Sequence, residues 1–198
     1  MSNHSISRKR RGRARRFSFP RRRLGVLVLA AASIATAQRF ELRSLAPYVP
    51  SPEKVVERML QLAEVKKTDV VYDLGSGDGR IIAMAAERFG ARAVGVEIDG
   101  ELVAKSEEML KQLGLGDRVE VIQGNLLEVD LSPASVVTLY LLTSSNKMLK
   151  PNLESLRPGS RVVSHDFEID GWTPLKTERV RSDGRTHAIY LYEIGKQQ

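Results

Sequence analysis

Hydrophobic and polar positions along the chain predict buried strands that alternate with amphipathic helices. The run at 70–74 is β-branched, aromatic and apolar, as in a strand that is buried on both faces. A glycine-rich stretch at 75–79 follows, and residues 81–89 resume with the spacing of a helix. The same patterns predict further strands at 91–97, 118–123, 135–142 and 161–164, and further helices at 100–113 and 147–156.

Residues before the first helix and near the C-terminus predict two further features, an extended lead-in and a hairpin. Residues 46–52 contain three prolines, which favour an extended lead-in, and Ser51 is suited to cap a helix that runs to about residue 64. Near the C-terminus, two strand-like runs flank Asp183 and Gly184, a strong hairpin signal. We therefore expect an α/β fold, a doubly wound, seven-stranded, mostly parallel sheet that ends in an antiparallel hairpin.

Positive charge is concentrated at the N-terminus. The chain of 198 residues has a net charge of +7, but residues 1–39 contain eleven Lys and Arg and no acidic residue, so residues 40–198 carry −4. The apolar stretch at 24–37 is shorter than the about 20 residues that span a bilayer, but it is typical of a signal-peptide core. Three interpretations are open. The segment could be an export signal or membrane anchor, a mitochondrial presequence, or a basic tail that contacts anionic membrane or RNA.

These features predict the organisation of the chain. We expect a basic tail at 1–23, a signal or anchor at 24–37, a linker at 38–50 and a folded domain at 51–198. The predicted location is membrane-associated or exported through the N-terminal segment, and mitochondrial in a eukaryotic source. Because the folded domain is mildly acidic, we expect it to bind no nucleic acid. We also expect the protein to be a monomer.

Two residue types limit the possible chemistry. The absence of cysteine excludes disulfides, thiolate catalysis and cysteine-based zinc sites. The three histidines are too widely spaced along the chain to predict a metal site.

The glycine-rich turn after the first strand is the strongest chemical signal. A strand, a glycine turn and a helix allow a nucleotide-like ligand to lie against bare backbone at a helix N-terminus, although an ordinary glycine-rich turn is the alternative. Arg80 stands where a dinucleotide motif has its third glycine, and no phosphate-loop Gly-Lys-Ser/Thr follows. Gly-x-Gly-x-Gly preceded by Asp73 is instead the pattern of an S-adenosylmethionine site. The candidate contacts are Asp73, Gly75, Ser76, Gly77, Asp78 and Gly79.

Polar residues at the ends of the next two strands extend this predicted site. Glu97 follows Asp73 at close to the spacing of about 20 residues that is expected for a carboxylate that binds ribose hydroxyls. Asp99 is the rival, but it is better placed to cap the next helix. Asn125, with Leu126 beside it, is a candidate for contact with the adenine edge, or a plain helix cap.

Four residues are candidates for acceptor binding and catalysis. Tyr48 is expected either to form a wall of the ligand pocket or to pack the lead-in onto the domain. Asn146 belongs to a polar cluster at 143–146, after the fourth strand. His165 and Asp166 end the fifth strand, where they could position the acceptor, remove its proton, or simply cap and pack the strand end.

With these residues in view, residues 46–194 resemble the class I S-adenosylmethionine-dependent methyltransferases. Within that class they are most similar to the lysine methyltransferases of the adenine nucleotide translocase and the ATP synthase c subunit, with their prokaryotic relatives. The segments that carry the resemblance are 48–52, 71–80, 140–142 and 162–167, together with Asn146 and Trp172.

The resemblance implies S-adenosylmethionine as the cofactor and N-methylation of a protein lysine, with a membrane protein as one possible acceptor. Tyr48, Asn146 and Trp172 then become candidate walls around that acceptor. Thr143 stands where the family usually has a proline, which leaves the shape of the acceptor pocket open. A small-molecule amine or other metabolite as acceptor, and a binding module without transfer activity, are the alternative functions.

Overall fold

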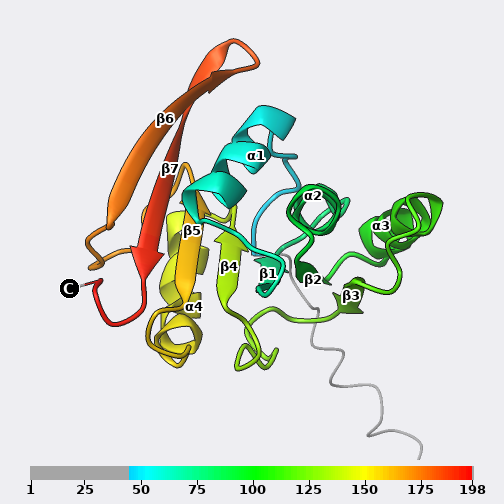
Figure 1. Ribbon diagram of the computed structural model, residues 1–198. Helices are drawn as coiled ribbons and strands as arrows, with labels where there is room; N and C mark the ends of the chain where they lie inside the picture. The colour runs from blue at the N-terminus through cyan, green and yellow to red at the C-terminus, as the bar shows by residue number, and fades with distance from the viewer. Residues whose placement is uncertain (1–44, 198) are drawn as a thin grey trace, which may run out of the picture. The chain divides into compact units, whose positions relative to one another are not determined.

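The computed structural model of the protein describes residues 45–197. These residues form a seven-stranded sheet with the order β3-β2-β1-β4-β5-β7-β6 (Figure 1). Strands β1 to β5 are parallel, whereas β7 runs antiparallel to both β5 and β6. The predicted fold class is therefore confirmed. The elements are α1 (Glu53–Leu62), β1 (Val70–Leu74), α2 (Arg80–Phe89), β2 (Arg92–Glu97), α3 (Gly100–Gln112), β3 (Val119–Gln123), β4 (Val136–Leu139), α4 (Thr143–Glu154), β5 (Arg161–His165), β6 (Lys176–Ser182) and β7 (Arg185–Glu193).

The sheet reverses its strand order at β1, which pairs with β2 on one side and with β4 on the other. At such a switch point the connections leave toward opposite sides, so a crevice opens beyond the carboxyl ends of the strands. The glycine turn at 75–79 follows β1 directly. The topology therefore places this turn where doubly wound folds bind their ligands.

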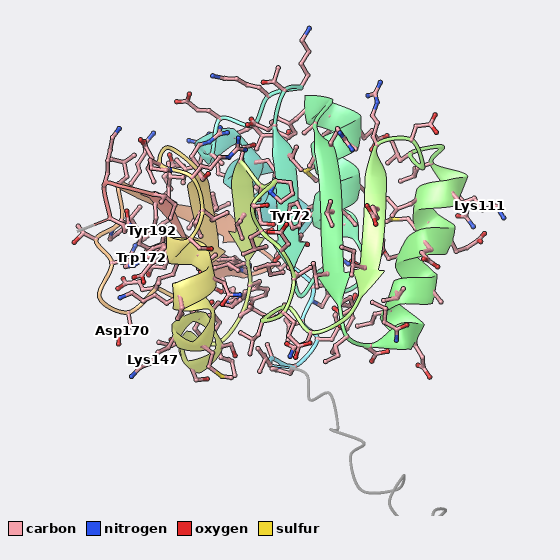
Figure 2. The ribbon with its side chains drawn as sticks, turned by 90° about the horizontal axis from the view of Figure 1, so that it is seen from below. Tyr72, Lys111, Lys147, Asp170, Trp172 and Tyr192 are labelled. Carbon is pink, nitrogen blue, oxygen red and sulfur yellow. The ribbon has the colours of Figure 1, made fainter. Side chains whose placement is uncertain are left out.

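The two faces of the sheet form two apolar clusters. Alternate residues of β1 point to opposite faces, so Val71 joins the cluster with α1, α2 and α3, while Tyr72 and Leu74 join the cluster with α4. Figure 2 looks at the face that carries α4 and shows Tyr72 near the middle of the sheet, with Trp172 and Tyr192 beside that helix. The rings of Trp172 and Tyr192 meet edge to face, with centroids 5.6 Å apart.

Two predicted helix starts are wrong. Helix α4 begins at Thr143 instead of residue 147, because the Ser145 and Asn146 N–H groups both donate to the carbonyl of Leu142 at 2.9 Å. The polar cluster at 143–146 is thus the first turn of the helix. Ser51 does not cap α1, which begins at Glu53 after Pro52 and has no side-chain cap. The Pro52 carbonyl accepts the Val55 and Val56 N–H groups, and the Ser51 hydroxyl bonds to His165.

The prediction of a membrane-associated or exported location is wrong for the part of the chain that the structure describes. Within residues 45–197 no helix is long and apolar enough to cross a membrane. The longest is α3 with 13 residues, whereas a span needs about 20. The basic tail and the apolar segment at 24–37, to which the prediction of a signal or anchor referred, lie outside the described residues.

Candidate functional site

The glycine turn is held against the end of β2. The N–H groups of Gly75 and Ser76 both donate to the Val96 carbonyl, at 2.8 and 3.0 Å. Gly75, Gly77 and Gly79 have φ angles of +82°, +54° and +81°, in the left-handed region that side chains with a Cβ rarely adopt. The glycines therefore allow the tight turn from which α2 starts at Arg80.

Glu97 lies at the end of β2 and is buried beneath this turn. One carboxylate oxygen accepts the Gly77 N–H at 2.8 Å, and the other accepts the N–H groups of Ile98 and Asp99 at 2.8 and 3.0 Å. The Asp99 carboxylate caps α3 by accepting from the Glu101 and Leu102 N–H groups, as the sequence indicated. The carboxylate at the end of β2 therefore fixes the position of the glycine turn.

Asp73 is a buried carboxyl group at the end of β1. It accepts a hydrogen bond of 2.7 Å from the Thr138 hydroxyl on β4. Burial raises the pKa of Asp73 to about 7; the Thr138 hydroxyl opposes this shift, and the nearby Glu97 and Asp78 carboxylates add to it. Near neutral pH this group is poised between its charged and uncharged forms.

Residues 45–51, which we call the strap, cover the turn. The Tyr48 ring lies so close to Gly77 that a Cβ at that glycine would come within 2.7 Å of it. Arg80 forms a bidentate pair with Asp78 at 2.9 and 2.6 Å and also donates to the Ser51 carbonyl at 2.9 Å. Burial, followed by the Asp78 carboxylate, raises the pKa of Tyr48.

The strap, the glycine turn and the ends of β2 and β4 enclose a cavity of about 210 Å³. Most of the predicted cofactor contacts line it, and Gly79 is the exception because it lies behind the turn against Ser106. Sequence reasoning missed Ser51 and Tyr140 as lining residues; the position of Tyr140 after a buried strand was the available signal. The predicted residues on the cavity wall are Tyr48, Asp73, Gly75, Ser76, Gly77, Asp78, Glu97, Asn125 and Leu126.

Other predicted residues lie away from this cavity. Asn146 is fully buried, with its amide nitrogen 3.4 Å from the carbonyls of Phe167 and Glu168. Trp172 does not line the cavity; its indole N–H donates to Glu154 at 3.5 Å, and its ring packs in the core. The walls around the cavity are therefore made by other side chains than these two.

Asn125 reaches the cavity but also has a local role. Its side-chain carbonyl accepts from the Leu127 N–H at 3.0 Å, and its amide nitrogen donates to Glu128 at 2.9 Å. Residues 126–128 form a turn and not a helix, so Asn125 closes a turn, and the alternative interpretation as a helix cap is wrong.

His165 and Asp166 belong to a buried polar network behind the cavity wall. The His165 ring stacks on the Tyr140 ring, with centroids 3.8 Å apart. Its Nδ1 lies 2.8 Å from the Ser51 hydroxyl, and its Nε2 lies 2.9 Å from Nδ1 of His187 on β7. Burial lowers the pKa of His165 to about 4, against the opposing effect of Asp166. The ring is therefore neutral at neutral pH.

Asp166 connects this network to the protein surface. Its carboxylate accepts from the Ala188 N–H at 2.8 Å and pairs with the half-exposed Arg185 side chain at 2.8 Å. Burial would raise the pKa of Asp166, but the Ala188 N–H, His165 and Arg185 together hold it below its ordinary value. Arg185 also donates to the Tyr140 hydroxyl at 3.0 Å.

The side chains of His165, Asp166 and His187 are close enough to each other to be considered as a metal site, within the part of the chain that the structure describes. The arrangement favours hydrogen bonding instead. The 2.9 Å separation of the two ring nitrogens is that of a hydrogen bond, and the Arg185 guanidinium already lies against the Asp166 oxygen that faces them. His165 Nε2, His187 Nδ1 and the facing Asp166 oxygen, the three atoms that would have to hold a metal together, therefore already have partners.

Comparison with known proteins agrees with this geometry. Residues 73–176 match the family described as the ANTKMT methyltransferase domain. The chain is 51% identical over 154 residues to a protein-lysine N-methyltransferase of Saccharolobus islandicus, covering 77% of this chain and 96% of that protein. It is 31% identical over 176 residues to a Caenorhabditis elegans lysine N-methyltransferase named for the ATP synthase c subunit, covering 84% of this chain and 90% of that one.

A solved structure is also similar. An RNA methyltransferase from Salinibacter ruber, crystallised with S-adenosyl-L-homocysteine, matches with a TM-score of 0.69 and 52% identity over 74% of this chain and 94% of that chain. The glycine turn, the switch-point cavity and these sequence matches lead to the same conclusion: the chain belongs to the ANTKMT methyltransferase family.

Proposed function

We propose that this protein is an S-adenosylmethionine-dependent methyltransferase that modifies the side-chain nitrogen of a protein lysine. The observation that carries the proposal is the switch-point cavity, closed by the glycine turn and the strap and lined by Asp73 and Glu97. The printed names of the relatives from Saccharolobus and Caenorhabditis, both lysine N-methyltransferases, support the acceptor.

The residues of the cavity fit this cofactor. The buried Ser76 hydroxyl is one of the side-chain groups without a partner among the described residues, so it is available to a ligand. Asp73 offers a negative charge to a cationic ligand, and Glu97 lies where a ribose would be bound. When bound, the cofactor supplies an activated methyl group on a sulfonium, and transfer to nitrogen breaks the carbon–sulfur bond and leaves a neutral thioether.

The cavity walls suit an amine acceptor. Tyr48 and Tyr140 contribute aromatic surface, which excludes water from the reacting groups. Removing water from around a lysine lowers its pKa and favours the neutral amine, the form that has a free electron pair for the methyl group. The protein's main tasks are then alignment and removal of one proton.

The raised pKa of Asp73 predicts a pH-dependent cofactor affinity. A cationic ligand prefers the ionised carboxylate, so we expect affinity to fall as pH decreases below about 7, by up to about tenfold per pH unit. Calorimetric titration between pH 5.5 and 8.5 measures this slope. Asp73→Asn is expected to bind weakly and with little pH dependence; a wild-type affinity that stays constant over this range contradicts the assignment.

Asp73 also affects the stability of the unliganded protein. This stability changes with pH in the opposite direction to the cofactor affinity. Its folded pKa lies above the ordinary value of an aspartate, so between pH 4 and 7 the folded state holds a proton that the unfolded chain has lost. The free energy of unfolding contributed by this group therefore decreases as pH rises from about 4 to 7. The difference in melting temperature between wild type and Asp73→Asn, followed across this range, measures it.

The acceptor is identified with the full-length chain, methyl-labelled S-adenosylmethionine and an extract of the source organism. We expect label in protein, mapped by mass spectrometry to lysine, and no label with a Glu97→Ala variant. Label only in small molecules would assign the enzyme to metabolite methylation, and cofactor binding without any transfer would indicate a binding module.

RNA is the second candidate acceptor, because the similar Salinibacter protein is described as an RNA methyltransferase. The charge of the described residues disfavours it, since residues 45–197 contain four more acidic than basic residues. Digestion of the labelled extract with ribonuclease or with protease distinguishes the two acceptors. Label that is released by ribonuclease alone would replace the lysine proposal.

A further inference from the structure

A continuous line of hydrogen bonds leads from the cavity wall into the protein interior. Ser51, which lines the cavity, lies 2.8 Å from Nδ1 of His165, and Nε2 of His165 lies 2.9 Å from Nδ1 of His187. The three residues are almost completely buried, with 4%, 0% and 1% of their surfaces exposed. Nε2 of His187 is among the buried side-chain atoms that have no partner within the described residues.

The donors of this line can all point in one direction. A neutral imidazole has one N–H donor and one acceptor nitrogen. If the Ser51 hydroxyl donates to His165 Nδ1, then His165 carries its proton on Nε2 and donates to His187 Nδ1, and the His187 proton lies on Nε2. Such an arrangement can pass a proton inward by shifting each hydrogen along its own bond, without movement of heavy atoms.

One carboxylate lies beside both rings at the inner end of this line. The Asp166 carboxylate lies 3.6 Å from His187 Nδ1 and 3.4 Å from His165 Nε2. Arg185 pairs with the same carboxylate and extends to the surface, and the Tyr140 ring stacks on His165. Asp166 thus offers a counter-charge to an imidazolium at His187, although part of its charge is already paired with the half-exposed Arg185.

We propose that Ser51, His165 and His187 form a proton relay that removes a proton from the acceptor ammonium, an inference that rests on the proposed lysine methylation. An N–H bond of the ammonium breaks and leaves its electron pair on nitrogen, and the proton passes to the Ser51 oxygen. The Ser51 hydroxyl proton moves to His165 Nδ1, and the Nε2 proton of His165 moves to His187 Nδ1. His187 becomes an imidazolium beside Asp166. When the product has left, the same shifts run in reverse and return the proton from His187 through His165 and Ser51 to water in the cavity, which restores the starting tautomers. His165 and His187 act through Ser51, so they are positioning residues.

The test compares kcat and KM from pH 6.5 to 9.5 for the full-length wild type, His187→Gln and Ser51→Ala, with a lysine peptide identified by the labelling experiment. We expect kcat to fall roughly 10²-fold at pH 7 in both variants, a typical contribution of acid–base catalysis. The loss should shrink to a few-fold near pH 9.5, because solution then supplies neutral lysine as its pKa of about 10.4 is approached. Ser51→Thr, which keeps the hydroxyl, should restore most of the activity at pH 7.

Thr186→Ala, at an exposed position next to His187, is the matched control and should show the wild-type profile. Cofactor affinity and melting temperature are measured for every variant, so that damage to the cavity or the fold is recognised. If His187→Gln does not fold, the Ser51→Ala and Ser51→Thr pair decides the matter. An equal loss of kcat at every pH, or no loss at all, would overturn the relay.

A second measurement does not depend on turnover. The ¹⁵N shifts of the histidine rings in the unliganded protein should show His165 neutral at pH 7 and protonated on Nε2. A proton on Nδ1 of His165 would reverse the line of donors and exclude the relay. Failure of the wild type to methylate any lysine would instead refute the proposed function, so the two failures are distinguishable.

Discussion

Replacing Glu97 by alanine is expected to weaken cofactor binding at least about 100-fold, which corresponds to about 2.7 kcal/mol. The carboxylate accepts three backbone N–H groups, and one of these belongs to Gly77 in the turn that faces the cavity. Its loss leaves these donors without partners, at about 1–3 kcal/mol for each one that stays buried, and also removes the proposed ribose contact. Calorimetric titration with S-adenosylmethionine measures the effect.

Glu97→Gln and Glu101→Ala are the controls for this prediction. Glutamine keeps one carbonyl acceptor but brings an amide NH₂ toward backbone donors, so we expect an intermediate loss of affinity. Glu101 is an exposed carboxylate in the first turn of α3, and its removal changes the net charge equally without touching the turn. Wild-type affinity in Glu97→Ala would refute the assignment of this residue to the cofactor site.

Gly77→Ala is expected to cause a comparable loss of cofactor affinity for a different reason. A Cβ at this position would lie 2.7 Å from the Tyr48 ring, so either the strap must move or the turn must distort. The residue also has a φ of +54°, where a Cβ adds backbone strain of about 1–2 kcal/mol. We expect at least a roughly 30-fold weaker affinity and a lower melting temperature.

Gly114→Ala separates the two causes. Gly114 follows α3 with a φ of +67°, and a Cβ there would have nothing within 4 Å. This variant should show the backbone strain as a small loss of stability, with wild-type cofactor affinity. If Gly77→Ala behaves in the same way as Gly114→Ala, the contact between Tyr48 and the glycine turn does not shape the cofactor site.

Much of the fold was predictable from sequence because its signals are local. A buried β1 is marked by its own apolar residues, the turn after it by three glycines that a left-handed backbone requires, and the β6–β7 hairpin by Asp183 and Gly184. Asp99 was recognised as a helix cap for the same reason, since a cap bonds only to residues within one turn.

The two misplaced helix starts have different causes, and the first is a side chain with a distant partner. Ser51 has the right residue type and position for a cap of α1, but its hydroxyl bonds to His165, 114 residues along the chain. The beginning of α4 was misplaced for another reason. Short polar residues suit a loop, and they also suit the first turn of a helix, where the first N–H groups have no partner within the helix.

By itself, the sequence determined the strands, the glycine turn, the carboxylate at the end of β2 and the family of this protein. Only the tertiary structure decided which of the candidate residues meet. The antiparallel pairing of β5 with β7 brings His187 against His165, and the parallel pairing of β1 with β4 brings Thr138 to Asp73. The physical reason is that local patterns fix the conformation of a segment, whereas contacts between side chains from different strands depend on strand order and register, which no single segment encodes.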